Sequence, residues 1–313
     1  MAEVMLFGEP MVMFVAETAQ PLEDVEMFRR SLAGAELNVA IGLVRLGHSA
    51  AYCTKLGTDP FGKYAEKKIR SEGIEAQVSY DSRYWTGFQL KNRVSEGDPE
   101  VVYFRENSAA SHMTVEDVDQ LDFKEAKILH ITGIPPALSR SCLEATCHLI
   151  ETARSNGMLV SFDPNLRPSL WESREVMIKT INDLAAKADL VLPGTGEGRI
   201  LMGSEDPEAI AEYYRAHGAK IVIVKNGSTG AYVCSDQYKK HCPGFRVEHV
   251  VDTVGAGDGF AVGVLSALLE GLSPEEAAIR GNAIGAIQVS VRSDNEGLPN
   301  RAELESFIAN NRS

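Results

Sequence analysis

The chain has 313 residues, of which 44% are apolar and 24% charged, and its formal net charge is −13. This composition is ordinary for a globular protein and excludes the disordered and collagen-like classes. The acidic balance, with no run rich in Lys or Arg, argues against a nucleic-acid partner, because phosphate backbones are bound by basic patches. The length admits one large α/β domain or two smaller ones.

The cysteines and the N-terminus indicate where the protein resides. Five cysteines without a Cys-x-x-Cys pair favour reduced thiols over a disulfide framework or a zinc site. No basic segment with an apolar signal core begins the sequence, and no run of about 18 apolar residues occurs. We therefore expect a cytoplasmic protein without a membrane partner.

Apolar runs rich in Val, Ile and Leu alternate with helical periodicities along much of the chain. In chain order they are a run at 4–7, a helix at 37–46, a run at 128–131, a helix at 142–153, and runs at 159–162, 190–192 and 221–224. Because these runs are continuously apolar, each strand should be buried on both faces, as in a parallel sheet covered by helices. The sequence predicts an α/β fold with a doubly wound, mostly parallel sheet.

Residues 9–31 and about 77–108 break this rhythm. They contain alternating stretches at 11–15, 86–90 and 101–104, with no helical pattern between them. We expect antiparallel strands that form a small β-sheet lid on a single domain spanning the chain, and a lid excludes water during a reaction. An edge hairpin that merely completes the main sheet is the alternative.

Residues 251–260, Val-Asp-Thr-Val-Gly-Ala-Gly-Asp-Gly-Phe, place three glycines and two aspartates at the start of an apolar helix. Glycines there allow close approach of an anion, which the free amides and positive dipole end of the helix attract. Gly255, Ala256 and Gly257 are predicted to cradle a phosphoryl group while Asp258 accepts a hydroxyl proton. Simple helix capping by Asp258, worth about 0.3–1 kcal/mol, leaves the glycines and Asp252 unexplained.

Two segments resemble the motifs of the ribokinase-like (PfkB) carbohydrate kinases. Residues 252–260 resemble the C-terminal motif, and residues 31–47, Ser-Leu-Ala-Gly-Ala-Glu-Leu-Asn-Val-Ala-Ile-Gly-Leu-Val-Arg-Leu-Gly, resemble the N-terminal one. They lie far apart and in the family's order, so the resemblance covers nearly the whole chain. It implies a core with a β lid, ATP as phosphoryl donor, Mg²⁺, Asp258 as catalytic base and Gly255 to Gly257 as anion hole.

The resemblance also implies nucleotide and metal contacts. The nucleotide set is Lys225, Gly227, Gly230, Gly255, Gly257, Asn282, Ala283 and Gly285, although Gly227 and Gly230 are also typical hairpin residues. The family often has Asn-x-x-Glu where this chain has Gly194-Thr-Gly-Glu197, so Mg²⁺ would depend on Glu197 and water. Some relatives hold a monovalent cation, and Asp252 and Val254, beside residues 288–297, would frame such a site.

Two arginines bear on the acceptor. Arg105 lies on the predicted lid, and Arg167 follows the carboxyl end of a core strand, where α/β sheets bind ligands. Two guanidinium groups facing one cleft suit a carboxylated sugar, because each can grip a carboxylate bidentately. A structural ion pair is the alternative for each arginine.

Residues 8–12, 34–38 and 131–134, with these arginines, are most similar to the 2-keto-3-deoxygluconate kinase branch, which phosphorylates the C6 hydroxyl of a keto-acid. The substrate contacts implied are Gly34, Asn38, Gln89, Tyr103, Arg105, Ile134, Arg167, Asp252 and Asp258, with Gln89 standing where many members have an aromatic residue. Fructokinases and other neutral-sugar kinases share most of these motifs and are the alternative. A non-catalytic sugar-binding regulator is a minor alternative from another class.

The lid segments also bear on assembly. Met11, Met13, Phe14 and Phe104 would share one face of the lid sheet. Because such a face often packs against a second subunit, we expect a homodimer through the lid strands.

Overall fold

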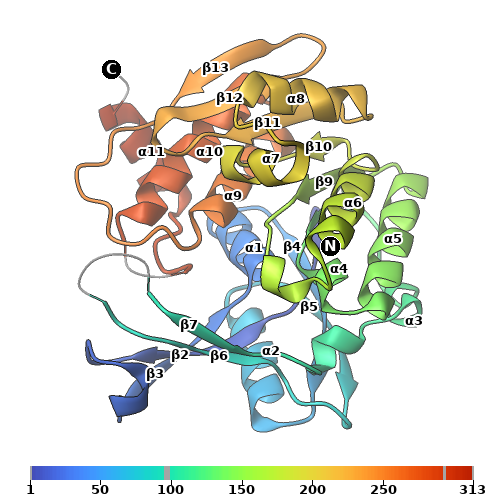
Figure 1. Cartoon of the computed structure of the whole chain (residues 1–313), viewed down its shortest axis with the longest axis vertical. Helices are drawn as coiled ribbons and strands as arrows, with labels where there is room; N and C mark the ends of the chain where they lie inside the picture. Colours follow the sequence, from blue (N-terminus) through green and yellow to red (C-terminus); the bar gives the residue numbers. More distant parts are fainter. Residues whose placement is uncertain (1, 95–98, 292–293, 312–313) are drawn as a thin grey trace.

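A nine-stranded sheet forms the centre of the computed structural model, which describes residues 2–94, 99–291 and 294–311 (Figure 1). The strands from β11 through β10, β9, β8, β1 and β4 to β5 are parallel, and β12 pairs antiparallel with both β11 and β13. The strand bounds are β1 (Val4–Phe7), β4 (Ala50–Gly57), β5 (Glu75–Asp81), β8 (Ile128–Thr132), β9 (Leu159–Asp163), β10 (Leu190–Val191), β11 (Ile221–Lys225), β12 (Gly230–Cys234) and β13 (Lys239–Pro243). The apolar runs thus form the predicted strands.

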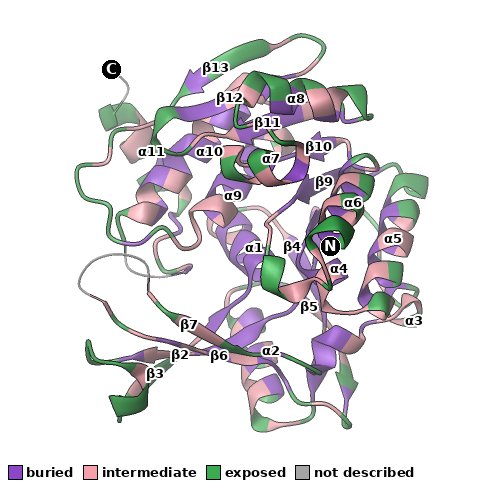
Figure 2. Ribbon diagram, in the orientation of Figure 1, coloured by how far each residue is buried: buried purple, intermediate pink, exposed green. Residues whose placement is uncertain are grey.

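Helices cover both faces of this sheet, and each face has its own hydrophobic core. Val4 and Leu6 of β1 belong to one core, whereas Met5 and Phe7 belong to the other, because successive side chains of a strand point to opposite faces. On the first face pack α1 (Ala35–Arg45), α2 (Pro60–Ser71), α9 (Ala256–Leu269), α10 (Pro274–Val289) and α11 (Arg301–Asn311); on the second pack α3 (Val115–Val118), α4 (Pro135–Leu138), α5 (Arg140–Ser155), α6 (Arg174–Ala185), α7 (Thr195–Met202) and α8 (Pro207–Ala216). Figure 2 shows the central strands buried between the two layers. The doubly wound α/β prediction is confirmed.

Within the described parts of the chain, no helix has the length and apolar character needed to cross a membrane.

A separate four-stranded sheet lies beside this core, in the order β3-β2-β6-β7 (Figure 1). Its strands are β2 (Met11–Ala16), β3 (Phe28–Ala33), β6 (Phe88–Lys91) and β7 (Val101–Phe104). The alternating stretches therefore form strands as predicted, and the sheet is not an extension of the main one. The alternative of an edge hairpin is wrong.

Two details of this lid differ from the prediction. Residues 77–81 belong to β5 of the main sheet, because β5 pairs along its whole length with β4. The second lid segment therefore begins near β6. β2 also pairs with β6 in parallel, although β2–β3 and β6–β7 are antiparallel as expected. β2 and β6 continue the chain from the carboxyl ends of the parallel strands β1 and β5, and so they leave the core in the same direction.

Aromatic side chains attach the lid to the core. Phe14 and Phe88 pack against Phe61 of α2, with ring centroids 5.6 and 5.8 Å from the Phe61 centroid. Met11 and Met13 are also buried within the chain. Met11 and Met13 alternate with Phe14 along β2 and line cavities on the opposite face of the lid sheet, so the prediction that Met11, Met13, Phe14 and Phe104 share one apolar face is wrong.

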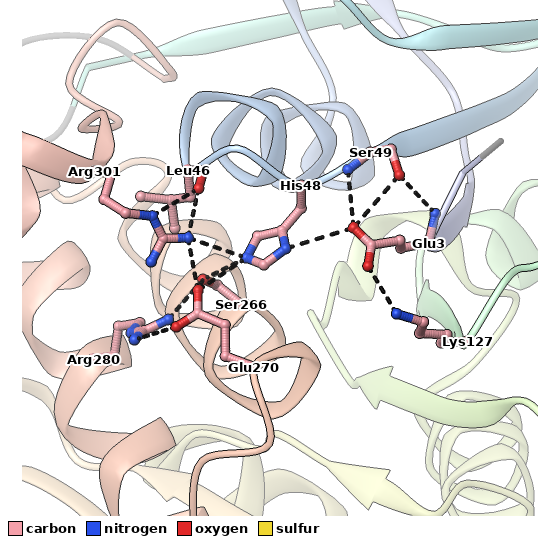
Figure 3. Close-up of polar contacts among 9 residues, drawn as sticks. All are labelled: Glu3, Leu46, His48, Ser49, Lys127, Ser266, Glu270, Arg280 and Arg301. Atoms are coloured by element: carbon pink, nitrogen blue, oxygen red, sulfur yellow. Dashed lines mark hydrogen bonds and ion pairs between the residues drawn. The ribbon is translucent and has the colours of Figure 1, made fainter.

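An ionic network joins the elements at the far end of α9 (Figure 3). Glu270, which follows α9, accepts from Arg280 of α10 at 2.8 Å and pairs with Arg301 of α11 at 2.6 Å. His48, between α1 and β4, lies 3.0 Å from Ser266 of α9. Burial alone would raise the pKa of Glu270, but the hydrogen bonds from the two arginines lower it to about 2.

We expect Glu270→Gln to lower the free energy of unfolding at neutral pH by about 1–3 kcal/mol, because two arginines lose a charged partner. The folded pKa lies below that of an unfolded glutamate, about 4.3, so this stabilisation is present at neutral pH. It is lost as pH falls from about 4.3 towards 2. Urea unfolding of both proteins across this range measures the difference.

Glu144→Gln is the matched control, because Glu144 also pairs with an arginine, Arg140, at 2.9 Å but on an exposed helix surface. This control substitution should lower the free energy of unfolding by less than about 0.5 kcal/mol. Equal destabilisation by both variants would contradict a special role for the Glu270 network.

Candidate active site

A cavity of about 680 Å³ lies between the lid and the carboxyl ends of the main-sheet strands. Its lining includes the predicted residues Gly34, Asn38, Gln89, Tyr103, Arg105, Ile134, Arg167, Glu197, Lys225, Gly255, Gly257 and Asp258. Asp252, Ala256, Gly227, Gly230, Asn282, Ala283 and Gly285 are not among the lining residues. The fold thus gathers residues from both sequence motifs and from the lid around one space.

The entry of α9 forms one wall of this cavity. Gly255 has a φ of 78°, and a β-carbon there would collide with the carbonyl oxygen of Asp294, so only glycine fits. The Ala256 amide already donates to the Thr253 carbonyl at 3.3 Å. A β-carbon at Gly257 would lie 3.8 Å from the Lys225 ammonium. The positive end of the helix and a lysine therefore face the same point, which suits an anion.

Asp258 stands in the first turn of α9, half-buried beside two asparagines. Its Oδ2 accepts from Asn38 Nδ2 at 2.8 Å, and its Oδ1 accepts from Asn165 Nδ2 at 3.4 Å. The Asn38 side chain is itself oriented by Asn295, which donates to Asn38 Oδ1 at 3.0 Å. Burial raises the pKa of Asp258 to about 6, although the Asn38 hydrogen bond opposes the shift. The carboxyl is thus ionised at neutral pH and able to take a proton.

Asp163 and Lys225 form a charged pair at the ends of β9 and β11. Lys225 Nζ donates to Asp163 Oδ2 at 2.6 Å, and Asp163 Oδ1 accepts the backbone N–H of Asn165 at 3.1 Å. Burial would lower the pKa of Lys225, but Asp163 and Glu197 raise it above its ordinary value. Asp163 and Asn165 were not predicted as site residues, although their position at the end of an apolar strand was an available signal.

Glu197, the predicted metal ligand, holds two backbone segments together. Its two carboxylate oxygens accept the backbone N–H groups of Gly194 at 2.7 Å and Leu166 at 3.0 Å. Burial raises the pKa of Glu197, while Lys225 opposes the shift. Gly194 thus contributes its amide to a cap on α7 and not a side-chain ligand. In the ranges that the structure describes, no group of three or more His, Cys, Asp or Glu side chains could hold a metal.

That donor set fits Mg²⁺ bound mainly through water and phosphate. Mg²⁺ usually keeps several waters and takes one or two carboxylates together with substrate phosphates. Glu197 and Asp163 both line the cavity near Lys225 and retain free lone pairs. They are the residues that would hold the hydrated ion.

The two arginines differ in their partners. Arg105 is buried and donates to Glu9 Oε2 at 2.8 Å through Nε, and Ser108 also binds this glutamate. Arg105 thus forms the structural ion pair that was the alternative, and its side chain also borders the cavity, so its contact with a substrate stays a prediction. Arg167 is exposed, donates only to the backbone carbonyls of Asn165 and Leu166, and has no ion pair with any residue that the structure describes. Arg167 is thus the arginine available to an anionic ligand.

The residues predicted around adenine have structural partners of their own. The Asn282 amide donates to the carbonyls of Cys242 and Pro243 at 3.2 and 3.1 Å, and Ala283 is fully buried. Gly227 and Gly230, with φ of 55° and 109°, make the turn between β11 and β12. Gly285 packs near the Ala256 carbonyl. Contact of these residues with a nucleotide stays a prediction.

Comparison with known proteins gives relatives over almost the full length. The family model described as pfkB family carbohydrate kinase matches residues 1–301. A 2-dehydro-3-deoxygluconokinase of Bacillus subtilis is 46% identical over 98% of this chain and 95% of its own. A PfkB protein from Polaromonas sp. JS666 has 47% identity and a TM-score of 0.90, covering 98% of this chain and 100% of that one. An E. coli protein assigned as ribokinase II was solved with ATP and Mg²⁺. It has 25% identity and a TM-score of 0.89, and the match covers 99% of this chain and 100% of that one.

We expect Asn38→Ala to raise the pKa of Asp258 above about 6, because the hydrogen bond that favours the ionised carboxylate is lost. Carbon-13 NMR titration of carboxyl-labelled aspartate measures this pKa without any ligand, and Asp258→Asn assigns the signal. Asn165→Ala is the control, since its bond is longer, and should shift the pKa less. An unchanged pKa in Asn38→Ala would contradict the role given to this contact.

Proposed function

Because the chain belongs to the pfkB family of carbohydrate kinases, we propose that it transfers the γ-phosphoryl group of ATP to the terminal hydroxyl of 2-keto-3-deoxygluconate, also named 2-dehydro-3-deoxygluconate. The observation that carries the choice of acceptor is Arg167, an exposed guanidinium on the same cavity as Asp258. An acid sugar offers it a carboxylate, which a neutral sugar lacks. The nearly full-length relative from Bacillus subtilis supports the same acceptor.

In the proposed reaction, Asp258 accepts the proton of the acceptor hydroxyl as that oxygen attacks. ATP supplies the phosphoryl group and leaves as ADP, and Mg²⁺ would offset the charge of the phosphates. The first amides of α9 and the Lys225 ammonium face the point where negative charge develops, and preformed donors of this kind stabilise a loose transition state. Asp163 holds Lys225 in place, and Glu197 fixes the loops that follow β9 and β10.

Asn38 and Gly34 would contact sugar hydroxyls from α1 and its approach, and Gln89 and Tyr103 would cover the sugar from the lid. Gln89 and Tyr103 lie opposite each other on β6 and β7 and both border the cavity. Arg105, neutralised by Glu9, would shape this wall without providing a free charge. Most of the rate would come from positioning and exclusion of water.

The alternatives make different demands on the site. A fructokinase acts on a neutral sugar, which has no carboxylate for Arg167 to bind. A non-catalytic regulator would not need a carboxylate beside a helix N-terminus and a half-buried lysine. The ionised Asp258 and its surroundings therefore favour catalysis over sugar sensing alone.

We also propose a single domain, a lid-mediated homodimer and a cytoplasmic location. One core takes residues from both ends of the chain, from Val4 to Leu304, which supports one domain. Met27 and Phe104 of the lid segments remain 63% and 43% exposed, which leaves apolar surface for a second subunit. The five cysteines are free thiols, as expected in a reducing compartment. Sedimentation velocity measures the oligomeric state, and a monomer at all concentrations would contradict the dimer.

We expect Asp258→Asn to lower kcat by about 10²- to 10⁴-fold, because a general base is removed. ATP binding, measured by calorimetry, and folding, measured by circular dichroism, should be retained. Since the pKa of Asp258 is about 6, kcat/KM of the unaltered enzyme should fall as pH drops below 6 and Asp258 becomes protonated. Near-normal turnover by the variant would exclude Asp258 as the base.

We expect Arg167→Ala to raise KM for 2-keto-3-deoxygluconate by about 10- to 100-fold, the loss of a charged hydrogen-bonded pair. KM for fructose, if it is turned over at all, should change little. Coupled ATP assays across keto-acids, hexoses, pentoses and nucleosides measure both effects. Arg167→Lys keeps the charge without the bidentate geometry, so its KM for 2-keto-3-deoxygluconate should lie between those of the unaltered enzyme and Arg167→Ala. Equal effects on acidic and neutral sugars, or faster turnover of fructose by the unaltered enzyme, would overturn the acceptor.

A further inference from the structure

Lys91 of lid strand β6 is buried in an ionic cluster beside the entry of α9. Its ammonium nitrogen lies 2.7 Å from Oδ1 of Asp294 and 3.1 Å from Oδ2 of Asp252. The three side chains are at most 8% exposed. Burial would lower the pKa of Lys91, but the two carboxylates raise it above its ordinary value. The lysine is therefore a cation at neutral pH.

Both carboxylate residues touch the backbone that enters α9. Oδ1 of Asp252 accepts the Val254 N–H at 3.0 Å, which fixes the loop before Gly255. The carbonyl of Asp294 packs directly on Gly255. The cluster therefore connects the lid to the loop that sets the amides of the proposed anion site.

A monovalent cation at Asp252 and Val254 would compete with this lysine for the Asp252 carboxylate. Oδ2 of Asp252 already accepts from the ammonium group, and its Oδ1 accepts the Val254 N–H. A cation bound close to the ammonium group would be repelled, by about 4 kcal/mol if the two unit charges were about 4 Å apart at an effective dielectric constant of 20. Residues 292–293 of the segment proposed to frame the ion lie outside the described residues, but the side formed by Asp252 is already occupied.

We propose that Lys91 is a positioning residue whose ammonium takes the place of a monovalent cation within the chain. It offsets part of the negative charge of Asp252 and Asp294, joins the lid to the entry of α9, and makes phosphoryl transfer independent of added K⁺. The ammonium group is covalently attached to the chain, so its occupancy does not depend on the concentration of a free cation. The anion site therefore stays ordered in any salt. The inference rests on the proposed kinase function for its kinetic readout and on geometry for its binding readout.

The cluster opens onto a cavity of about 660 Å³ whose lining includes Lys91, Asp252 and Asp294. A small ion could therefore reach the space left by Lys91→Ala. This accessibility makes chemical rescue the sharpest test. Lys91→Met, which fills the space with an apolar chain, leaves no room for a rescuing ion.

The kinetic experiment measures kcat at constant ionic strength in choline, Li⁺, Na⁺, K⁺ and NH₄⁺ chlorides. The unaltered enzyme should show the same kcat in all five salts. Lys91→Ala should lose about 10²-fold in kcat in choline chloride, because the anion site is misplaced, and should recover most of it in K⁺ or NH₄⁺. Lys91→Met should lose as much without recovery. Lys55→Ala is the control: Lys55 is also largely buried, 2.6 Å from Asp117, and its loss should create no dependence on K⁺.

A thermal-unfolding experiment needs no catalysis and so separates this inference from the kinase proposal. The melting temperature of Lys91→Ala should rise saturably with K⁺ relative to choline, whereas that of the unaltered protein should not. If no sugar is phosphorylated, the proposed function fails and the melting curves alone decide on Lys91. Strong activation of the unaltered enzyme by K⁺, or no effect of any cation on Lys91→Ala in both experiments, would overturn the inference.

Discussion

The cavity depends on one constraint, the left-handed turn at Gly255 that starts α9. This turn lets the chain pass under the Asp294 carbonyl and directs the helix N-terminus at the cavity, where Asp258 follows in the first turn. A side chain at Gly255 would push the helix away from the Asp294 segment. The other polar groups of the site, including Lys225, line the cavity that this helix N-terminus faces.

Charge is balanced around that helix entry by partners from distant parts of the chain. Lys225 forms an ion pair with Asp163, and Arg105 forms one with Glu9. Lys91 pairs with both Asp252 and Asp294. A buried charge is tolerated only when it is paired, so these bonds fix the loops as firmly as packing does. Arg167 is the exception, because its guanidinium is exposed and, among the described residues, donates only to backbone carbonyls. An unpaired cation on a cavity rich in carboxylates is reasonable if a ligand brings the missing anion.

The sequence predicted well what depends on local pattern. Continuous apolar runs identified five parallel strands but not β4 or β5, alternation identified the lid, and the glycines with Asp258 identified the helix entry. The parallel pairing of β2 and β6 was missed, because alternation specifies a strand but not its partner. The Glu9–Arg105 and Lys91–Asp294 pairs were also missed, because their members lie 96 and 203 residues apart and no periodicity connects them. Which arginine is free for a ligand is decided by such contacts, and so it could be determined only from the fold.

The most direct measurement is a crystal structure of the protein with 2-keto-3-deoxygluconate and an ATP analogue that cannot transfer its phosphoryl group. The sugar carboxylate should contact the Arg167 guanidinium, and its terminal hydroxyl should lie within hydrogen-bonding distance of Asp258, facing the phosphate at the entry of α9. A sugar bound with its carboxylate away from Arg167, or with another group nearest Asp258, would contradict the proposed acceptor and the division of roles in the site.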